Sequence, residues 1–567
     1  MSTYSNPTAP LAQATPIAAA TLLPQKRGAI YTRAWVVELI LDLAGYCASE
    51  NLVDAVAIEP AAGDGAFLLA MVRRLVASCR HQSRPLLDCR DALIAFELDA
   101  PTATATRQAV YNILTEDGFA HDEGTILANT WVRVADALLE LPRLSTVDFV
   151  IGNPPYIRLE DVDGITMARY RAIYKTMVGR ADLYIPFFEA ALKRLKPGGV
   201  CAYICADRWM RNQYGSELRR FVTTAYGVET VVEMHGADPF ETDVSAYPAI
   251  IIIRKGTQGP VVVARATLGV ESIGGAALAR SISALRTQQN TLPSIPGLRM
   301  ARVEGWFAEA EPWPCVSPER LALLKHLEAN FYPLESVGTG TRVTIGIATG
   351  ADDVFITTDP DVVEPSRLLP LAMAQDTQTG QIQWSGHYLI SPWEYKGLID
   401  LNRYPRLCAY YEEHRTRLEG RYVGKRQPEQ WYRTIDRANL QLLRNPKLYV
   451  ADIKDRLNPV LDTGETYPHH NLYVVISSGW DYEVLGGLLL SDIAQFFIEC
   501  YAVRMRGGYL RFQAQYLRRI RVPRPHDLTL TQAEELRLAF RQRDRVAATA
   551  IGFEIYGITA LPKEVAL

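Results

Sequence analysis

The feature that most constrains the fold is an alternation of short β-branched runs with longer amphipathic stretches between Ala29 and Lys255. This alternation is typical of βαβ units, in which helices cover a mostly parallel sheet. It therefore predicts an α/β domain with an open, mostly parallel sheet. The predicted strands cover residues 54–59, 92–99, 131–136, 147–153, 200–207, 228–236 and 249–255, and the predicted helices cover 36–44, 68–78 and 183–195.

The rest of the chain has a different texture. Residues 1–27 are rich in Ala, Thr and Pro, lack the basic start of a secretory signal, and predict a flexible arm. The α/β domain is then expected over 28–256, followed by a weakly patterned linker region over 257–300. Between 301 and 567, short strands, aromatics and arginines follow without βαβ repetition, which predicts a second domain of mixed α+β structure. The longest purely aliphatic stretch, 249–253, is too short to cross a bilayer.

Composition sets limits on the class of protein. With 48% apolar and 22% charged residues, the chain has the make-up of a folded globular protein rather than a disordered or collagenous one. The net charge of -3 neither requires nor excludes a nucleic-acid partner. The 8 cysteines form no C-x-x-C pair. We therefore expect no zinc knuckle, no disulfide framework, no metal, and a reducing cytoplasmic location.

A glycine-containing loop follows the strand predicted over 54–59. From Glu59 to Phe67 it has the sequence EPAAGDGAF, and it leads into a predicted helix. Gly63 and Gly65 allow the backbone to approach a ligand closely, and the helix offers free N–H groups. Ligands bind at the carboxyl ends of strands in open parallel sheets. The loop is thus a candidate cofactor site, although a tight turn without a ligand has the same pattern.

Two acidic residues stand at the ends of the next two predicted strands. Glu97 occupies the place where doubly wound folds bind a ribose diol, and Asp136 is a candidate acceptor for an exocyclic amine. Taken alone, each acid fits a helix cap or a solvated strand end better than a ligand contact.

The tetrapeptide Asn153-Pro154-Pro155-Tyr156 follows the fourth predicted strand, at the same sheet edge. Its prolines fix an extended backbone and leave the Pro154 carbonyl without a helical partner. The Asn153 amide oxygen and this carbonyl can both accept hydrogen bonds from one planar NH2 group, and Tyr156 offers a flat face for stacking. Behind two cofactor-like strand ends, this motif favours an enzymatic site over a simple turn.

In these motifs the chain resembles the gamma-class (TaqI-like) N6-adenine DNA methyltransferases of type II restriction–modification systems. The resemblance runs motif by motif from Gly28 to Lys255 and more loosely beyond. It implies an S-adenosylmethionine-dependent, Rossmann-like methyltransferase domain followed by a target-recognition domain. The implied reaction is the site-specific transfer of a methyl group from S-adenosylmethionine to N6 of a flipped-out adenine in double-stranded DNA. Such an enzyme protects DNA from a separately encoded restriction endonuclease.

The resemblance also implies roles for individual residues. The chain departs from the family at Arg33, where the family usually has proline, and at Ala62, where it often has cysteine. Phe240, within ADPFETDVSA, matches the aromatic residue that packs on the extruded base. The implied catalytic residues are Asn153, Pro154, Pro155 and Tyr156, with Tyr156 and Phe240 stacking on the base, and the implied cofactor residues are Thr32, Glu59 (methionine amine), Pro60, Gly63, Gly65, Phe67, Glu97 (ribose), Asp136 (adenine amine) and Asn153.

Two basic clusters in the second domain predict contacts with DNA phosphates. One lies among aromatics between 403 and 456, and the other, 504–524, contains no acid. Charge runs are usually solvated faces, but this density in a near-neutral chain favours phosphate contact. Segments 346–356 and 445–453 also resemble parts of the family's recognition domain. The residues predicted to bind DNA are Arg421, Lys425, Arg426, Arg504, Arg506 and Arg511.

Two other functions stay open at this point. One is methylation of a protein glutamine or an RNA base, against which the basic second domain argues. The other is a catalytically silent DNA-binding specificity module, against which the intact Glu59, Asp136 and NPPY motif argue. We expect a monomer without a membrane partner. In the sequence, His469-His470-Asn471 has no partner at metal spacing.

Overall fold

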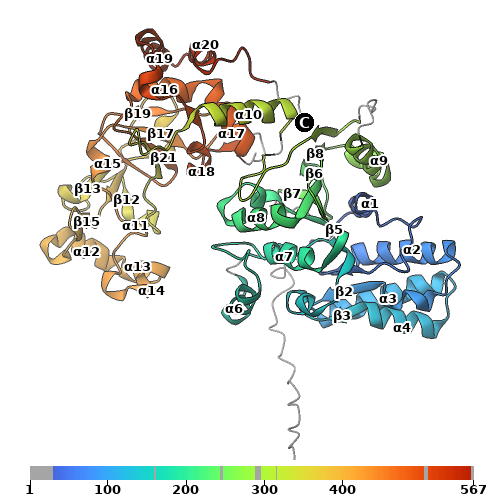
Figure 1. Cartoon of the computed structure of the whole chain (residues 1–567). Coiled ribbons are helices and arrows are strands. Elements are labelled where there is room, and N and C mark those ends of the chain that lie inside the picture. The colour runs from blue at the N-terminus through green and yellow to red at the C-terminus, as the bar shows by residue number, and fades with distance from the viewer. Residues whose placement is uncertain are drawn as a thin grey trace, which may run out of the picture. The chain divides into compact units, whose positions relative to one another are not determined.

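The computed structural model describes residues 30–158, 161–242, 247–287, 295–314, 316–502 and 509–562. It forms two compact units (Figure 1). The first contains the chain up to Cys205 together with Asp238–Ala246, and the second contains Ala206–Ala237 and Tyr247–Leu567.

The first unit contains a parallel sheet with the strand order β3-β2-β1-β4-β5. Each neighbouring pair in this order is parallel; Ala57 of β1, for example, lies opposite Leu93 of β2 and Phe149 of β4. This sheet confirms the predicted α/β class. The strands are β1 (Ala57–Glu59), β2 (Leu93–Glu97), β3 (Val132–Val134), β4 (Val147–Gly152) and β5 (Leu195–Ala206).

Helices connect these strands and supply the apolar core around them. The helix predicted over 68–78 extends over α2 (Ala66–His81), which buries Phe67, Leu68, Met71 and Leu75. Such spacing places apolar side chains on one helical face. The other helices of this unit are α1 (Ala34–Ala44), α3 (Ala100–Glu116), α4 (His121–Trp131), α5 (Ala137–Glu140), α6 (Gly164–Ile173) and α7 (Tyr184–Arg194).

Cys79 of α2 and the buried Cys89 are joined by a disulfide. The sequence predicted no disulfide framework, because the two residues form no recognisable spacing motif. Their pairing follows from the fold, which brings α2 next to the 3-10 helix Leu86–Asp91.

The second unit begins with four strands in the order β7-β6-β8-β9. The predicted linker region over 257–300 differs from the structure here, because it contains β8, α9 and the start of β9. Val261–Val263 of β8 are buried between β6 and β9. This short apolar run is stabilised by strands distant in sequence, so the local pattern alone understated it. The elements are β6 (Tyr226–Gly236), β7 (Pro248–Lys255), β8 (Val261–Thr267), α9 (Gly275–Arg286) and β9 (Leu298–Val303), with α8 (Ser216–Ala225) before them.

The remainder of the second unit has the mixed α+β structure that the sequence predicted. Two small sheets have the orders β11-β21-β17-β19 and β12-β14-β13-β20. An aromatic core that includes Phe355, Trp393, Tyr411 and Trp431 lies beside the second. The strands are β11 (Arg342–Ile345), β12 (Ile356–Thr357), β13 (Leu368–Ala372), β14 (Tyr388–Ile390), β17 (Lys447–Ala451), β19 (Val460–Asp462), β20 (Tyr467–Pro468) and β21 (Leu472–Ile476), and the helices around them include α10 (Pro318–Asn330), α11 (Asp352–Phe355), α12 (Pro405–Glu413), α13 (Arg415–Glu419), α14 (Tyr422–Arg426) and α15 (Gln441–Arg444).

A helical layer formed by α16 (Tyr482–Leu490), α17 (Asp492–Tyr501), α19 (Leu530–Gln542) and α20 (Arg545–Tyr556) completes this unit. Gly486 and Gly487 let α16 approach α19 closely, since a Cβ at Gly487 would lie 2.5 Å from the Leu536 carbonyl oxygen. Within the described ranges, no single helix is long and apolar enough to span a membrane; only the bent pair α16–α17, taken together, meets that test of length and composition.

Candidate active site

The glycine loop between β1 and α2 has the tight conformation that its sequence predicted. Gly63 and Gly65 have positive φ angles of 55° and 92°. Thr106 of α3 fixes the loop, since its hydroxyl donates to the Gly63 carbonyl at 2.8 Å. A Cβ at Gly65 would lie 3.2 Å from the methyl group of Thr106. Glycine at this position therefore serves both the backbone angle and the close packing.

Glu97, at the end of β2, holds this loop from the other side. One carboxylate oxygen accepts the Gly63 N–H at 2.9 Å, and the other accepts the Asp99 N–H at 2.8 Å. The carboxylate is thus already aligned beside the glycine turn.

Glu59, at the end of β1, has a buried carboxylate that can accept a further hydrogen bond. It is 2% exposed, and its Oε2 has no hydrogen-bond partner among the residues that the structure describes. Burial, reinforced by the nearby Asp64, raises the pKa of Glu59 well above its ordinary value. Because burial without a partner disfavours the charged carboxylate, a cation that binds beside it would be favoured.

Asp136, at the end of β3, has two protein partners. It caps α5 through the Leu138 N–H at 2.9 Å, and it accepts the Tyr170 hydroxyl of α6 at 2.7 Å. Burial raises the pKa of Asp136, and these hydrogen bonds oppose that rise. Sequence reasoning missed Tyr170, because α6 carries no motif and lies 34 residues further along the chain.

Asn153, directly after β4, is oriented by the segment before α1. Its Nδ2 donates to the Ile30 carbonyl at 2.9 Å and to the Thr32 hydroxyl at 3.2 Å. Its Oδ1 is buried and has no hydrogen-bond partner in the described part of the chain. Because both amide hydrogens are directed to Ile30 and Thr32, the free oxygen is left to accept a hydrogen bond from something else.

Tyr156 and Phe240 lie next to each other, although 84 residues separate them in the sequence. Their ring centroids are 6.0 Å apart, in an edge-to-face arrangement. Phe240 is held there by an antiparallel bridge to Thr32.

The structure thus brings most of the predicted site residues to one sheet edge. Glu59, Glu97, Asp136 and Asn153 lie at the carboxyl ends of strands that are neighbours in the order β3-β2-β1-β4. Pro60 and Pro154 are buried. Pro60 lies close to Gly152, since a Cβ added at Gly152 would come within 3.4 Å of the Pro60 ring. Pro155 is half-buried, and Phe67 is buried at the start of α2.

Arg421 does not occupy a position from which it can contact DNA. It is 7% exposed, and its guanidinium donates to four backbone carbonyls while stacking over Phe355 at 5.0 Å. This corrects the prediction of a phosphate contact: the side chain holds the aromatic core together. The carbonyls are those of Leu418, Thr349, Trp431 and Arg433.

The other predicted DNA contacts divide into exposed and paired side chains. Lys425 and Arg426 of α14 are exposed. Arg511 forms an ion pair with Asp452. Arg504 and Arg506 lie outside the described residues. The remaining arginines of that cluster are also paired: Arg518 with Glu335, Arg519 and Arg521 with Glu328, and Arg524 with Asp527.

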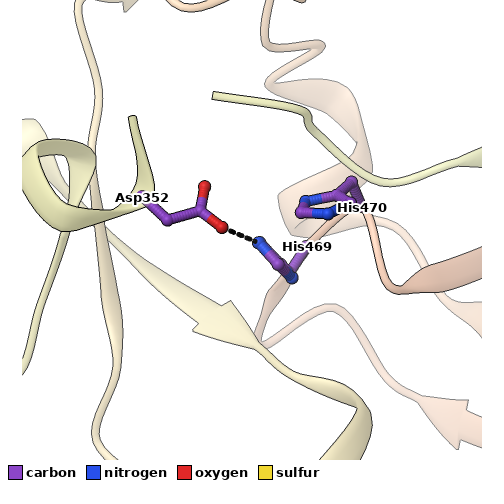
Figure 2. A group of neighbouring side chains, drawn as sticks. All are labelled: Asp352, His469 and His470. Atoms are coloured by element: carbon purple, nitrogen blue, oxygen red, sulfur yellow. Dashed lines mark hydrogen bonds and ion pairs between the residues drawn. The ribbon is translucent and has the colours of Figure 1, made fainter. Parts of the chain in front are cut away.

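The fold gives His469 and His470 an acidic neighbour that the sequence did not show. The Nε2 atom of His469 lies 3.1 Å from Oδ2 of Asp352, and possible ligand atoms of the three residues lie within 4.8 Å of one another (Figure 2). This corrects the expectation that these histidines have no partner at metal spacing. The other Asp352 oxygen accepts the Thr349 hydroxyl, whereas Nδ1 of His469 is buried and has no hydrogen-bond partner among the residues that the structure describes.

A second polar cluster lies at the ends of β5 and β6. Asp207, Glu233 and His235 lie within the same 4.8 Å limit, but the two acids are paired with Arg211 and Arg265. Cations of the chain itself therefore neutralise this cluster.

Comparison with known proteins identifies the class of the chain. The Eco57I restriction-modification methylase model matches residues 109–240, and the TaqI-like C-terminal specificity domain model matches residues 395–522. In fold, the chain is similar to the type IIL restriction-modification enzyme MmeI in complex with DNA, with a TM-score of 0.61, 12% identity, and coverage of 94% of this chain and 74% of that one. Together with the strand-end site, these matches define an S-adenosylmethionine-dependent DNA methyltransferase with a C-terminal specificity domain.

Similarity over the whole chain narrows this class to a family. The chain is 42% identical to the type II methyltransferase M.PaeR7I of Pseudomonas aeruginosa, over 94% of this chain and 92% of that one. It is 39% identical to the type II methyltransferase M.XhoI of Xanthomonas vasicola, over 96% of this chain and 99% of that one. The chain belongs to the type II methyltransferases of restriction–modification systems, which confirms the predicted family and methyl donor.

Proposed function

We propose that the enzyme methylates N6 of adenine in double-stranded DNA. The observation that carries this proposal is the orientation of Asn153, whose amide hydrogens are both engaged and whose buried oxygen accepts no hydrogen bond from the described residues. A buried acceptor without a partner is costly. The amine of a nucleobase is a donor of the kind that would satisfy it.

The chemistry follows from the weakness of this amine as a nucleophile. Its lone pair is delocalised into the purine ring. When the Asn153 oxygen and the Pro154 carbonyl accept the two amine hydrogens, they favour a pyramidal nitrogen and localise the lone pair for attack. These are prepositioned dipoles, so they need little reorganisation during the reaction. When bound, S-adenosylmethionine would supply a methyl group carried on a positively charged sulfur. As the amine nitrogen attacks, the N–CH3 bond would form while the S–CH3 bond breaks with its electron pair left on sulfur, and the nitrogen would release one proton to solvent.

The residues at the sheet edge fit this cofactor. Glu59 offers a buried carboxylate oxygen that has no partner in the described part of the chain, which suits the ammonium of the methionine moiety. Glu97 would hold the ribose beside the glycine turn, and Asp136 would hold the adenine amine of the cofactor. Thr32, Pro60, Gly63, Gly65, Phe67 and Asn153 would line the same pocket.

The target base must leave the duplex to reach Asn153. Flipping costs a few kcal/mol of stacking and pairing, and an aromatic pocket recovers part of it. Tyr156 directly follows Asn153-Pro154-Pro155, and the ring of Phe240 lies beside that of Tyr156, which supports a role of both rings in contacting the flipped base. We assign the role of the catalytic motif to Asn153, Pro154, Pro155 and Tyr156.

We further propose that the specificity domain contacts DNA through Lys425 and Arg426, and through the segment that contains Arg504, Arg506 and Arg511. Lys425 and Arg426 are exposed and lie within the residues matched by the specificity-domain model. The enzyme would act as a monomer in the cytoplasm, where it protects DNA from a separately encoded restriction endonuclease.

The deciding experiment is sequencing that detects modified bases. DNA is taken from a methylation-free host that expresses the wild-type chain or its Asn153→Ala variant. We expect N6-methyladenine at one short motif in the wild-type sample only. Methylation of cytosine, or unmodified DNA despite good expression of folded, cofactor-binding protein, would overturn the adenine assignment.

A further inference from the structure

A single short segment, residues 30–33, contacts both sides of the proposed reaction centre. The Ile30 carbonyl and the Thr32 hydroxyl orient the Asn153 amide. The same segment pairs with the chain around Phe240 through the bridge between Thr32 and Phe240. The Glu241 N–H adds a hydrogen bond to the Tyr31 carbonyl at 3.0 Å. The acceptor and the stacking ring are therefore tied to the same stretch of backbone.

Arg33 makes three of the described contacts to residues 238–240. Its Nε donates to the Phe240 carbonyl at 2.8 Å, and its Nη2 pairs with Asp238 at 2.7 Å. Its backbone N–H donates to the Pro239 carbonyl at 3.0 Å. One residue thus contacts three consecutive positions of the segment that presents the ring.

Exposure limits what the ion pair of Arg33 contributes to folding stability. The side chains of Arg33 and Asp238 are 38% and 58% exposed, and exposed ion pairs contribute little to stability. Proline, which the resembling family usually has at this position, would supply neither the N–H nor the guanidinium. The described side-chain hydrogen bonds of Arg33 are made to the segment 238–240 and position it.

The ring contact between Tyr156 and Phe240 is also not enough to hold Phe240 during catalysis. A base that enters between the rings replaces their edge-to-face contact, which has a centroid distance of 6.0 Å. The three contacts from Arg33 involve backbone oxygens and Asp238, so the entering base leaves them intact.

We propose that Arg33 is a positioning residue that holds the Phe240 segment in place when the flipped adenine enters the site. This inference rests on the proposed function, since it assigns Phe240 to the base pocket. Loss of Arg33 should weaken retention of the flipped base and alignment of its amine, while binding of duplex DNA and of the cofactor stays intact.

The test compares Arg33→Ala with Arg80→Ala, a matched control in the same unit. Arg80 is also an exposed arginine that contacts an aspartate side chain and a backbone carbonyl, both of Asp117. For each full-length variant, we would measure the single-turnover methylation rate, the Kd values for cofactor and cognate duplex, and the thermal midpoint. Fluorescence of 2-aminopurine at the target position would report base flipping.

We expect Arg33→Ala to lower the methylation rate about 10- to 100-fold, a size typical of small displacements of reacting groups. The 2-aminopurine signal should fall in parallel, and both Kd values should stay within about twofold, as weakly coupled sites allow. Arg33→Lys, which can keep the ion pair to Asp238, should recover part of the rate. Arg80→Ala should match the wild type.

Two outcomes would overturn the positioning role. One is a wild-type rate and fluorescence signal in Arg33→Ala. The other is a parallel loss of thermal midpoint and cofactor affinity, which would show a general structural role. The rate comparison uses whichever base the wild-type enzyme modifies. A non-adenine product therefore overturns the proposed function alone, whereas wild-type behaviour of Arg33→Ala overturns the positioning role alone.

Discussion

The hydroxyl of Tyr170 donates a hydrogen bond to Oδ2 of Asp136 at 2.7 Å, so a helix beyond the catalytic motif orients the acid at the end of β3. The other oxygen of that carboxylate is engaged by the cap of α5. The direction of Asp136 is therefore set by one donor on each carboxylate oxygen, and only one of these donors is close in sequence.

Replacement of Tyr170 by phenylalanine should weaken cofactor binding. The buried Asp136 loses a donor that lowers its pKa, so that pKa should rise and the acid limb of cofactor affinity should move to higher pH. We expect a loss of about 1.5–3 kcal/mol in binding, the usual size for a hydrogen bond to a charged group. Titration calorimetry across pH measures both effects. An unchanged pH profile would contradict this role.

Replacement of Glu59 by glutamine should reduce cofactor affinity and remove its pH dependence. In the free enzyme, burial raises the pKa of Glu59 above its ordinary value of 4.5. Protonated Glu59 contributes fully to the stability of the fold below pH 4.5, and this contribution is lost as the pH rises through the folded-state pKa of Glu59. Cofactor binding should therefore strengthen as pH rises, because the ammonium pairs with the carboxylate. The exposed Glu116→Gln provides the control.

Replacement of Arg421 by alanine should destabilise the protein without a specific effect on phosphate binding. It removes the guanidinium donor from four backbone carbonyls, three of them in buried contacts, and we expect a loss of at least about 2 kcal/mol in the free energy of unfolding. Lys425→Ala should do the opposite, with normal stability, weaker DNA binding and a salt slope that is smaller by about 1. Denaturant unfolding and DNA titration at several salt concentrations distinguish the two.

Replacement of Gly487 by alanine should disrupt the packing of α16 on α19. The added Cβ would lie 2.5 Å from the Leu536 carbonyl oxygen, and backbone cannot move aside as a flexible side chain can. We expect a loss of about 1–3 kcal/mol, as for other overpacked positions. Gly305→Ala, where an added Cβ meets no atom within 4 Å, should leave the unfolding midpoint nearly unchanged. Equal midpoints for the two variants would contradict this account.

The sheet edge was predictable because its residues follow buried strands in linear motifs. Glu59, Glu97, Asp136 and Asn153 each lie at the end of, or within two residues after, a run that identifies the strand. Their partners were not predictable. Tyr170 carries no motif, and the Ile30 carbonyl that orients Asn153 is a backbone group 123 residues away.

The partners of the basic residues in the second unit were likewise not predictable from the sequence. The stretch from Arg511 to Arg524 contains no acid in the sequence, yet its arginines are paired in the structure with acids such as Glu328 and Asp452. Arg421 looked like a surface charge because buried arginines are rare. Whether a charge is free depends on contacts between segments far apart in the chain, and composition does not report these.

The ion pairs of these arginines also affect how the enzyme would respond to ionic strength. An arginine that already holds a carboxylate must exchange it for a phosphate, and the released acid then attracts a cation from solution. Such an exchange returns fewer net counterions to the solvent than the capture of a phosphate by a free arginine. The logarithm of DNA affinity should therefore fall less steeply with the logarithm of salt concentration than a count of the arginines suggests. Association would then depend more on the shape of the duplex than on bulk attraction.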